Sequence, residues 1–164
     1  MAKPKNFLFV CKGNAARSQM AVGFARSLAN GNVNVYAAGV DPSGISQVAV
    51  DVMDEIGIDI SGQTPCKFDK VPMGKIDTVI TLSSDPDPLP KNLKKKANQI
   101  HWPLTDPTAT TGSDAEVKKA FRSVRDEILR MQEPSGAFPK RTGPGPAFGT
   151  ATAVLILEIP YRFL

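Results

Sequence analysis

The alternation of short apolar strands with amphipathic helices constrains the fold of this chain more than any other feature. Residues 6–10 (NFLFV) form an almost wholly apolar run rich in strand formers, which is typical of a strand buried on both faces. An amphipathic stretch follows at residues 18–30, with Gly31 as a stop signal. Further strands are predicted at residues 33–38, 76–82 and 99–104, and further helices at residues 47–56 and from Ser113 to about Gln132.

Together these elements predict a single α/β domain of three layers. Its four-stranded parallel sheet is expected to be flanked by helices and covered on both faces, with right-handed crossovers. The last helix has a clear start signal, because Ser113 and Glu116 form a capping box. In open parallel sheets the ligand site lies beyond the carboxyl ends of the strands. We therefore expect the site directly after Val10, Leu82 and Leu104.

A change of composition divides the chain in two. Residues 1–133 carry all the strands and helices named above, and they form the predicted globular domain. Residues 134–149 contain four prolines and four glycines, which is typical of a linker or a loose tail. Residues 151–159 (ATAVLILEI) are apolar again, and they could add a strand, pack on the core or mediate self-association. Residues 134–164 are thus an extension of open role, and the oligomeric state is open as well.

The composition excludes several classes of protein. The chain has 164 residues, of which 41% are hydrophobic, so it can bury a sizeable core without disulfides. Its two cysteines favour a reducing, cytoplasmic setting, and no apolar run approaches the roughly 20 residues that cross a bilayer. The net charge of +4 favours anionic partners. The basic run at residues 91–96 is interpreted as a solvated surface and not as a nucleic-acid site, because no binding motif accompanies it.

The loop between the first strand and the first helix has the composition of an anion site. Its sequence, CKGNAARS, puts a cysteine at the end of a buried strand and an arginine six positions later, where the helix begins. Backbone N–H groups of such a tight loop, continued into the unpaired N–H groups of the helix start, converge and can bind an oxyanion. The candidate binding residues are Lys12, Gly13, Asn14, Ala15, Ala16, Arg17 and Ser18.

Cys11 is the candidate nucleophile of this loop. Converging N–H dipoles and the guanidinium of Arg17 favour the thiolate form of this cysteine. Arg17 can also hold two oxygens of a tetrahedral anion in a bidentate geometry. The hydroxyl of Ser18 can donate to the Cys11 sulfur, both as attacking thiolate and as leaving group. The alternative is that Cys11 is only a core residue at a strand end, which is common for cysteine.

The segment VCKGNAARSQMA resembles the phosphate-binding loop of the low-molecular-weight protein-tyrosine phosphatase superfamily, whose motif is Cys-x5-Arg-Ser and which also contains arsenate reductases. The resemblance spans residues 6–133 and implies that residues 1–133 are a phosphatase-like or arsenate reductase-like catalytic domain. It also implies a general acid, an aspartate followed by proline on a distant loop. Asp106 in HWPLTDP fits this pattern and follows the fourth predicted strand. Cys11, Arg17 and Asp106 are thus the candidate catalytic residues.

Three local features favour arsenate reduction over phosphatase activity within this superfamily. Gln19 in RSQMA and the stretch IHWPLTDP resemble the arsenate reductases. Phosphotyrosine phosphatases typically carry aromatic residues after the Asp-Pro pair, whereas here Thr108, Ala109 and Thr110 follow. The leading hypothesis is a cytoplasmic arsenate reductase. The alternative is a phosphatase that hydrolyses phosphomonoesters through a cysteinyl phosphate, and a third hypothesis is an oxyanion-binding module without catalytic activity.

The source of the second thiol in arsenate reduction is left open by the sequence. Thioredoxin-coupled members carry two further cysteines after the third strand, whereas this chain has Ser83 and Ser84 in TLSSDPDPLP. A hydroxyl cannot resolve an arsenylated cysteine. We therefore expect an external thiol (glutathione, mycothiol or bacillithiol), regenerated by a glutaredoxin-like or thioredoxin-like protein. Cys66 is the other possible source, although the simpler interpretation is a free, partly buried thiol without a role.

No tightly bound cofactor and no metal are expected. With one histidine, His101, and no clustered ligands, a metal site has little support. We expect His101 to form structural hydrogen bonds near the Asp106 loop. Trp102 is expected to pack in the core and not to contact substrate.

Overall fold

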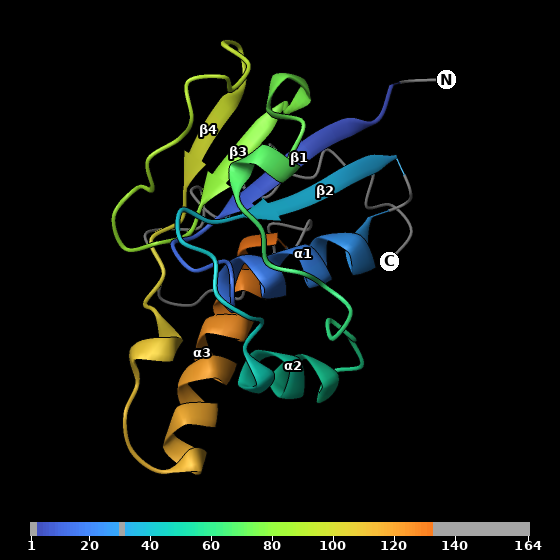
Figure 1. Cartoon of the computed structure of the whole chain (residues 1–164). Helices are drawn as coiled ribbons and strands as arrows, with labels where there is room; N and C mark the ends of the chain where they lie inside the picture. Colours follow the sequence, from blue (N-terminus) through green and yellow to red (C-terminus); the bar gives the residue numbers. More distant parts are fainter. Residues whose placement is uncertain (1–2, 30–31, 133–164) are drawn as a thin grey trace.

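The computed structural model describes residues 3–29 and 32–132, and Figure 1 shows their arrangement. Within them, four parallel strands form one sheet in the order β2-β1-β3-β4, which confirms the predicted sheet. The strands are β1 (Lys5–Val10), β2 (Val33–Ala38), β3 (Thr78–Thr81) and β4 (Asn98–His101). The helices are α1 (Arg17–Leu28), α2 (Gln47–Asp54) and α3 (Asp114–Gln132), with short 3-10 helices η1 (Phe68–Lys70), η2 (Met73–Lys75) and η3 (Pro107–Ala109). The predicted extension at residues 134–164 lies outside the described residues.

Element ends differ from the predicted ones by up to three residues. The fourth strand was predicted at residues 99–104, whereas β4 ends at His101. Beyond His101 single hydrogen bonds to the β3 side remain, from the N–H of Trp102 to the Thr81 carbonyl at 2.8 Å and from that of Leu104 to the Leu82 carbonyl at 3.2 Å, but the regular strand pairing has ended. The second helix was predicted to reach residue 56, whereas α2 ends at Asp54. Gly57 follows with a φ of +79°, and this left-handed backbone reverses the chain at a position where glycine is unstrained.

The two faces of the sheet are covered differently. All three α-helices gather on one side, over a core that includes Phe7 and Phe9 of β1 (Figure 1). The opposite face, with Leu8 and Val10, packs against the irregular connection that contains η1 and η2. Successive side chains of β1 thus point into two separate cores, as the apolar run of this strand predicted.

Trp102 lies in the larger core, directly after β4. Its side chain has no exposed area, and its ring centre lies 6.3 Å from that of Phe9. The prediction that Trp102 packs in the core is therefore confirmed. No helix in the described ranges is both long and apolar enough to span a membrane.

The sheet brings the three predicted site loops together at one edge. The N–H group of Leu82, after β3, donates to the carbonyl of Val10 at 2.8 Å. The N–H group of Leu104, after β4, donates in turn to the carbonyl of Leu82 at 3.2 Å. Because β1, β3 and β4 are parallel neighbours, the segments that follow them meet where the sheet argument placed the site.

Candidate active site

The loop from Cys11 to Ala16 is held in shape by the segment after β2. The carbonyl oxygens of Lys12, Gly13 and Ala15 accept hydrogen bonds of 2.9 to 3.0 Å from N–H groups within residues 41–46. The N–H groups of residues 13–16, by contrast, make no hydrogen bond to any other described residue. A loop with fixed carbonyls and unpaired N–H groups is an anion-binding arrangement.

Asn14 is the loop residue with the least common backbone conformation. Its φ is +47°, a left-handed value that asparagine tolerates better than most residues. The side chain is completely buried, and its Oδ1 accepts hydrogen bonds from the hydroxyl of Ser18 at 2.7 Å and from Nε2 of Gln19 at 2.9 Å. Its Nδ2 donates to the carbonyl of Cys66 at 3.3 Å. These bonds stabilise the turn that directs the loop toward α1.

Gly39, directly after β2, allows the backbone to approach this loop. A Cβ atom at position 39 would lie 2.7 Å from the carbonyl oxygen of Lys12 and 2.8 Å from that of Cys11. Real Cβ atoms do not come so close to backbone atoms, so any side chain here would displace the loop. Gly39 therefore belongs to the scaffold of the site.

The side chains of Cys11 and Ser18, at the two ends of the loop, contact each other. The Cys11 sulfur lies 3.0 Å from Oγ of Ser18, and both side chains are almost completely buried. Ser18 is in the first turn of α1, where the helix dipole and unpaired N–H groups give a positive potential. The Ser18 hydroxyl and the start of α1 therefore lie directly beside the candidate nucleophile.

Arg17 connects the loop to the segment after β4. One of its terminal nitrogens, Nη1, donates to the carbonyl of Leu104 at 3.1 Å, while Nη2 forms an ion pair with Oδ2 of Asp106 at 3.3 Å. The Arg17 side chain is only 6% exposed. These two contacts hold the planar guanidinium in a fixed orientation.

Asp106 is oriented by its own short 3-10 helix, η3. Its Oδ1 accepts hydrogen bonds from the backbone N–H of Thr108 at 3.0 Å and from the hydroxyl of Thr108 at 2.7 Å. Oδ2 is thereby left to face Arg17, and the side chain is 42% exposed. The structure thus brings the loop that carries Cys11 and Arg17 together with Asp106, the candidate acid, which follows Arg17 by almost 90 positions in the sequence.

Comparison with known proteins agrees with this geometry. The family model of low molecular weight phosphotyrosine protein phosphatases matches residues 6–133. The chain belongs to this family. An arsenate reductase of Halalkalibacterium halodurans is 39% identical over 124 residues, which cover 76% of this chain and 89% of that protein. A solved arsenate reductase in the phosphate binding state has a TM-score of 0.66 at 36% identity, and the match covers 76% of this chain and 91% of the other.

A more distant member of the same fold comes from another bacterium. The thioredoxin-dependent arsenate reductase of Corynebacterium glutamicum has a TM-score of 0.57 at 26% identity. The match covers 78% of this chain but only 60% of that one. The membership in the phosphatase family that the loop motif indicated is therefore confirmed, and relatives named arsenate reductase are among its members.

In this phosphatase-family chain, Ser83 and Ser84 lie beside the anion loop. The hydroxyl of Ser83 accepts a hydrogen bond from the N–H of Lys12 at 3.3 Å and donates to Asp87 at 2.9 Å. The hydroxyl of Ser84 donates to the Leu104 carbonyl, the same oxygen that Arg17 binds. The segment in which the family resemblance would place the further cysteines thus lies next to the site, and in this chain it carries hydroxyls, as the sequence states.

The thiol of Cys66 is hydrogen-bonded to the backbone of β2. The thiol donates to the carbonyl of Ala37 at 3.2 Å, and the side chain packs against the core on the face opposite the helices. Burial raises the pKa of the Cys66 thiol, the nearby Asp69 raises it further, and Lys70 lowers it. Its backbone carbonyl, by contrast, supports the site through Asn14.

His101 forms structural hydrogen bonds, as expected. Its Nδ1 lies 2.9 Å from the hydroxyl of Thr81, and its Nε2 lies 3.3 Å from the carbonyl of Ser84. These contacts tie the ends of β3 and β4 to the segment that carries Ser83. In the part of the chain that the structure describes, no group of three or more side chains is arranged to bind a metal ion.

The parts of the site that act through the backbone could not be predicted from the sequence. The hydrogen bonds from residues 41–46 to the loop carbonyls have no side-chain signature, so no motif could have revealed them. Gly39 was the one available signal, since it ends a predicted strand. Gln63, which binds Gln19, was also missed, because a single glutamine in a connecting segment carries no signal of its own.

Proposed function

We propose that this protein is an arsenate reductase with Cys11 as its nucleophile. The observation that carries the proposal is the meeting of Cys11, Arg17 and Asp106 at one edge of the sheet, with Ser18 3.0 Å from the sulfur. A nucleophile, an anion-binding cation and a proton donor are the groups that thiolate attack on an oxyanion requires. Relatives named arsenate reductase, at 39% identity, support the choice of oxyanion.

In the first step, arsenate binds to the N–H groups of residues 13–16 and to the guanidinium of Arg17. The Cys11 thiolate attacks arsenic and forms an S–As bond, while one arsenate oxygen leaves as water with a proton from Asp106. The bound anion shares the guanidinium with Asp106 and places a negative charge beside it.

In the second step, the thiolate of an external thiol attacks the sulfur of Cys11. An S–S bond forms and the S–As bond breaks with its electron pair left on arsenic. Arsenic is thereby reduced from the +5 to the +3 state, and arsenite leaves. The two electrons come from the two sulfurs, which end as a mixed disulfide that a redox protein must reduce.

The position of the other thiol in the chain supports an external donor. The Cys66 thiol donates to the carbonyl of Ala37 in β2, and Ser83 and Ser84 next to the loop carry hydroxyls. We propose glutathione, mycothiol or bacillithiol as co-substrate, with a glutaredoxin-like or thioredoxin-like reductant in the cytoplasm. The thioredoxin-dependent relative from Corynebacterium glutamicum supports the class of reductant.

The segment after Asp106 supports a small inorganic anion over a phosphotyrosine. Thr108, Ala109 and Thr110 form or follow η3, and none of them can stack on a phenyl ring. Trp102, the closest aromatic residue in the sequence, has no exposed area. A phosphatase would share the first step and then let water hydrolyse the cysteinyl phosphate.

The experiment that tests the proposal follows arsenate-dependent oxidation of NADPH by the full-length protein with each thiol and its redox system. We expect turnover with one of the thiols, and mass spectrometry should find that thiol in a mixed disulfide on Cys11. Cys11→Ser should abolish turnover but retain oxyanion binding. The proposal is wrong if no thiol supports turnover while an aryl phosphate is hydrolysed at enzymatic rates that Cys11→Ser abolishes.

A further inference from the structure

A continuous series of hydrogen bonds leads from Gln63 to the sulfur of Cys11. Nε2 of Gln63 donates to Oε1 of Gln19 at 2.8 Å and to its carbonyl at 2.9 Å. Nε2 of Gln19 donates to Oδ1 of Asn14 at 2.9 Å and to its carbonyl at 3.0 Å. Oδ1 of Asn14 accepts from Ser18, whose oxygen lies 3.0 Å from the Cys11 sulfur.

The hydroxyl of Ser18 has one hydrogen and two possible acceptors. While Cys11 is a thiol, its S–H can donate to Ser18, and Ser18 can donate to Asn14. A thiolate can only accept, so the Ser18 hydrogen must then turn to the sulfur. Oδ1 of Asn14 loses that donor at the moment when the nucleophile forms. Asn14 is completely buried, and a buried oxygen without a donor is unfavourable.

Gln19 supplies the replacement donor. Its two Nε2 hydrogens are directed at the two oxygens of Asn14, and its side chain is almost completely buried. With this second donor in place, Oδ1 of Asn14 stays paired after Ser18 turns away. The bond to the Asn14 carbonyl also stabilises the left-handed backbone that shapes the loop.

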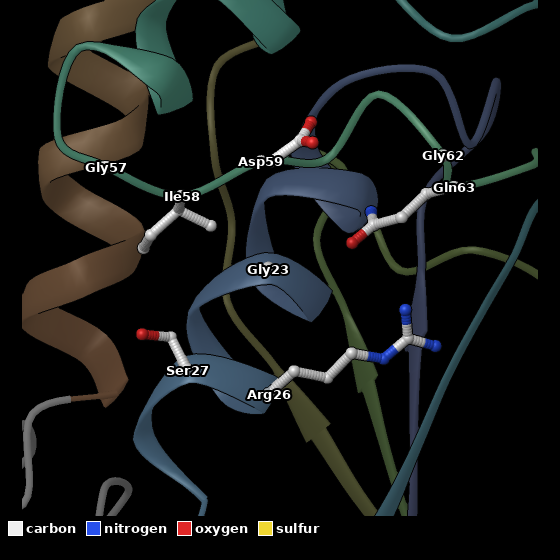
Figure 2. A pocket seen from close by; sticks show the side chains of 8 residues that line it. All are labelled: Gly23, Arg26, Ser27, Gly57, Ile58, Asp59, Gly62 and Gln63. Atoms are coloured by element: carbon white, nitrogen blue, oxygen red, sulfur yellow. The ribbon is translucent and has the colours of Figure 1, made fainter.

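Gln63 determines which end of the Gln19 amide faces Asn14. The reversed amide would place Oε1 of Gln19 against two acceptor oxygens and Nε2 against the Gln63 donor. Figure 2 shows Gln63 reaching from the segment after Gly62 back toward α1, upstream of Gly23. Together with Arg26 and Asp59, Gln63 lines an open pocket of about 530 Å³.

We propose that Gln19, oriented by Gln63, is a positioning residue that keeps Asn14 paired while the Ser18 hydroxyl stabilises the Cys11 thiolate. The inference rests on the proposed role of Cys11 as nucleophile. It does not depend on arsenate, since ionisation of Cys11 can be followed without substrate.

The test measures alkylation of Cys11 by iodoacetamide against pH in the full-length protein. Cys66→Ser is the background, so that one thiol remains. Gln19→Met keeps the side-chain volume but removes both donors. We expect the pH midpoint of alkylation to rise by half a unit to one unit, so that the rate at neutral pH falls by about three- to tenfold. Gln47→Met is the matched control, because Gln47 is exposed on α2 and among the described residues its side chain binds only Asp51, so its profile should not change.

Gln63→Met provides a second variant at the half-buried outer end of the series. We expect a smaller rise in the midpoint, and no additional rise when it is combined with Gln19→Met, because both residues act through Asn14. An unchanged midpoint in both folded variants overturns the proposal, even where arsenate turnover falls. If Gln19→Met does not fold, the Gln63→Met profile decides alone. Absence of arsenate turnover in the parent protein, with the midpoints shifted as expected, would contradict only the proposed function.

Discussion

The hydroxyl oxygen of Ser18 lies 3.0 Å from the sulfur of Cys11 and 2.7 Å from Oδ1 of Asn14. The hydroxyl therefore connects the nucleophile to the residue that shapes the anion loop. Since α1 begins at Arg17, the helix fixes the position of Ser18 relative to the loop N–H groups. Removing the hydroxyl should affect the charge on sulfur more than it affects the fold.

Ser18→Ala is expected to slow arsenate reduction by about 10- to 100-fold, because a hydrogen bond to a charged group contributes about 1.5 to 3 kcal/mol. The loss should appear in both steps, since the sulfur is the nucleophile in one and a bond partner in the other. Steady-state kinetics and the rate of Cys11 alkylation at neutral pH measure it. Ser27→Ala, at an exposed position of the same helix, is the control that should retain the parent rate.

Arg17→Lys tests whether a charge alone is enough at this position. A lysine retains the charge but cannot bind Leu104 and two anion oxygens in one plane. We expect kcat/KM for arsenate to fall by about 100- to 1,000-fold, the usual effect of losing an oxyanion donor. Isothermal titration with phosphate should show weaker binding as well. Arg26→Lys, near the other end of α1, should behave like the parent protein, and an equal loss there would indicate a general effect on the helix.

Asp106→Asn separates proton donation from anion binding. The asparagine can still accept the hydrogen bonds from Thr108, so η3 should form. Without the acid, departure of the oxygen should slow by roughly 100- to 10,000-fold. Binding of the oxyanion should not weaken, because Arg17 loses a competing carboxylate. A parent-like kcat would show that another group is the acid.

The position of this site could be predicted from the sequence because parallel pairing leaves few alternatives. Val10, Leu82 and Leu104 each follow a predicted strand, and hydrogen bonds between them hold the three segments at one edge. The order of Cys11, Arg17 and Ser18 at a strand-to-helix turn then indicates which edge carries the chemistry. Periodicity and motif spacing are local properties of the sequence, and they were sufficient to predict the position of the site.

The support of the site could not be predicted, because it depends on contacts between distant segments. Gln63 reaches Gln19 across 44 positions, and neither residue forms part of a pattern that predicts the contact. The sequence also carried no signal that the connection with η1 and η2 covers the face of the sheet opposite the helices. That connection contains Pro65 and Pro72 and has no helical or strand period, although Met73 and Ile76 in it are buried.

Cys66→Ser addresses the origin of the second thiol. The Cys66 thiol binds the Ala37 carbonyl, and burial keeps its pKa above the ordinary value, so little thiolate is present at neutral pH. We expect the variant to retain arsenate reduction with an external thiol and to form the same mixed disulfide on Cys11. Loss of turnover together with a disulfide between Cys11 and Cys66 in the parent protein would instead assign the resolving role to Cys66. Peptide mass spectrometry after arsenate treatment distinguishes the two results.

Glu55 links the end of α2 to α3, and its effect on stability should depend on pH. Its carboxylate accepts hydrogen bonds from Arg122 at 2.6 to 3.2 Å and from Arg125 at 3.0 Å. Chiefly through the hydrogen bonds from Arg122, the pKa of Glu55 falls from 4.5 to about 2. A carboxyl with a lower pKa in the folded state stabilises the fold above its unfolded pKa, and this contribution disappears as the pH falls through the folded pKa.

Glu55→Gln should therefore lower the free energy of unfolding at neutral pH, and the difference from the parent protein should shrink as the pH falls from 4.5 toward 2. Urea unfolding at a series of pH values measures this difference. Glu127→Gln on α3 is the control, since Glu127 has no ion pair with any other residue that the structure describes. A difference that stayed constant down to the lowest pH would mean that Glu55 acts by packing and not by its charge. In that case the buried Arg125 would owe its position to the Val52 carbonyl, which it binds at 2.7 Å.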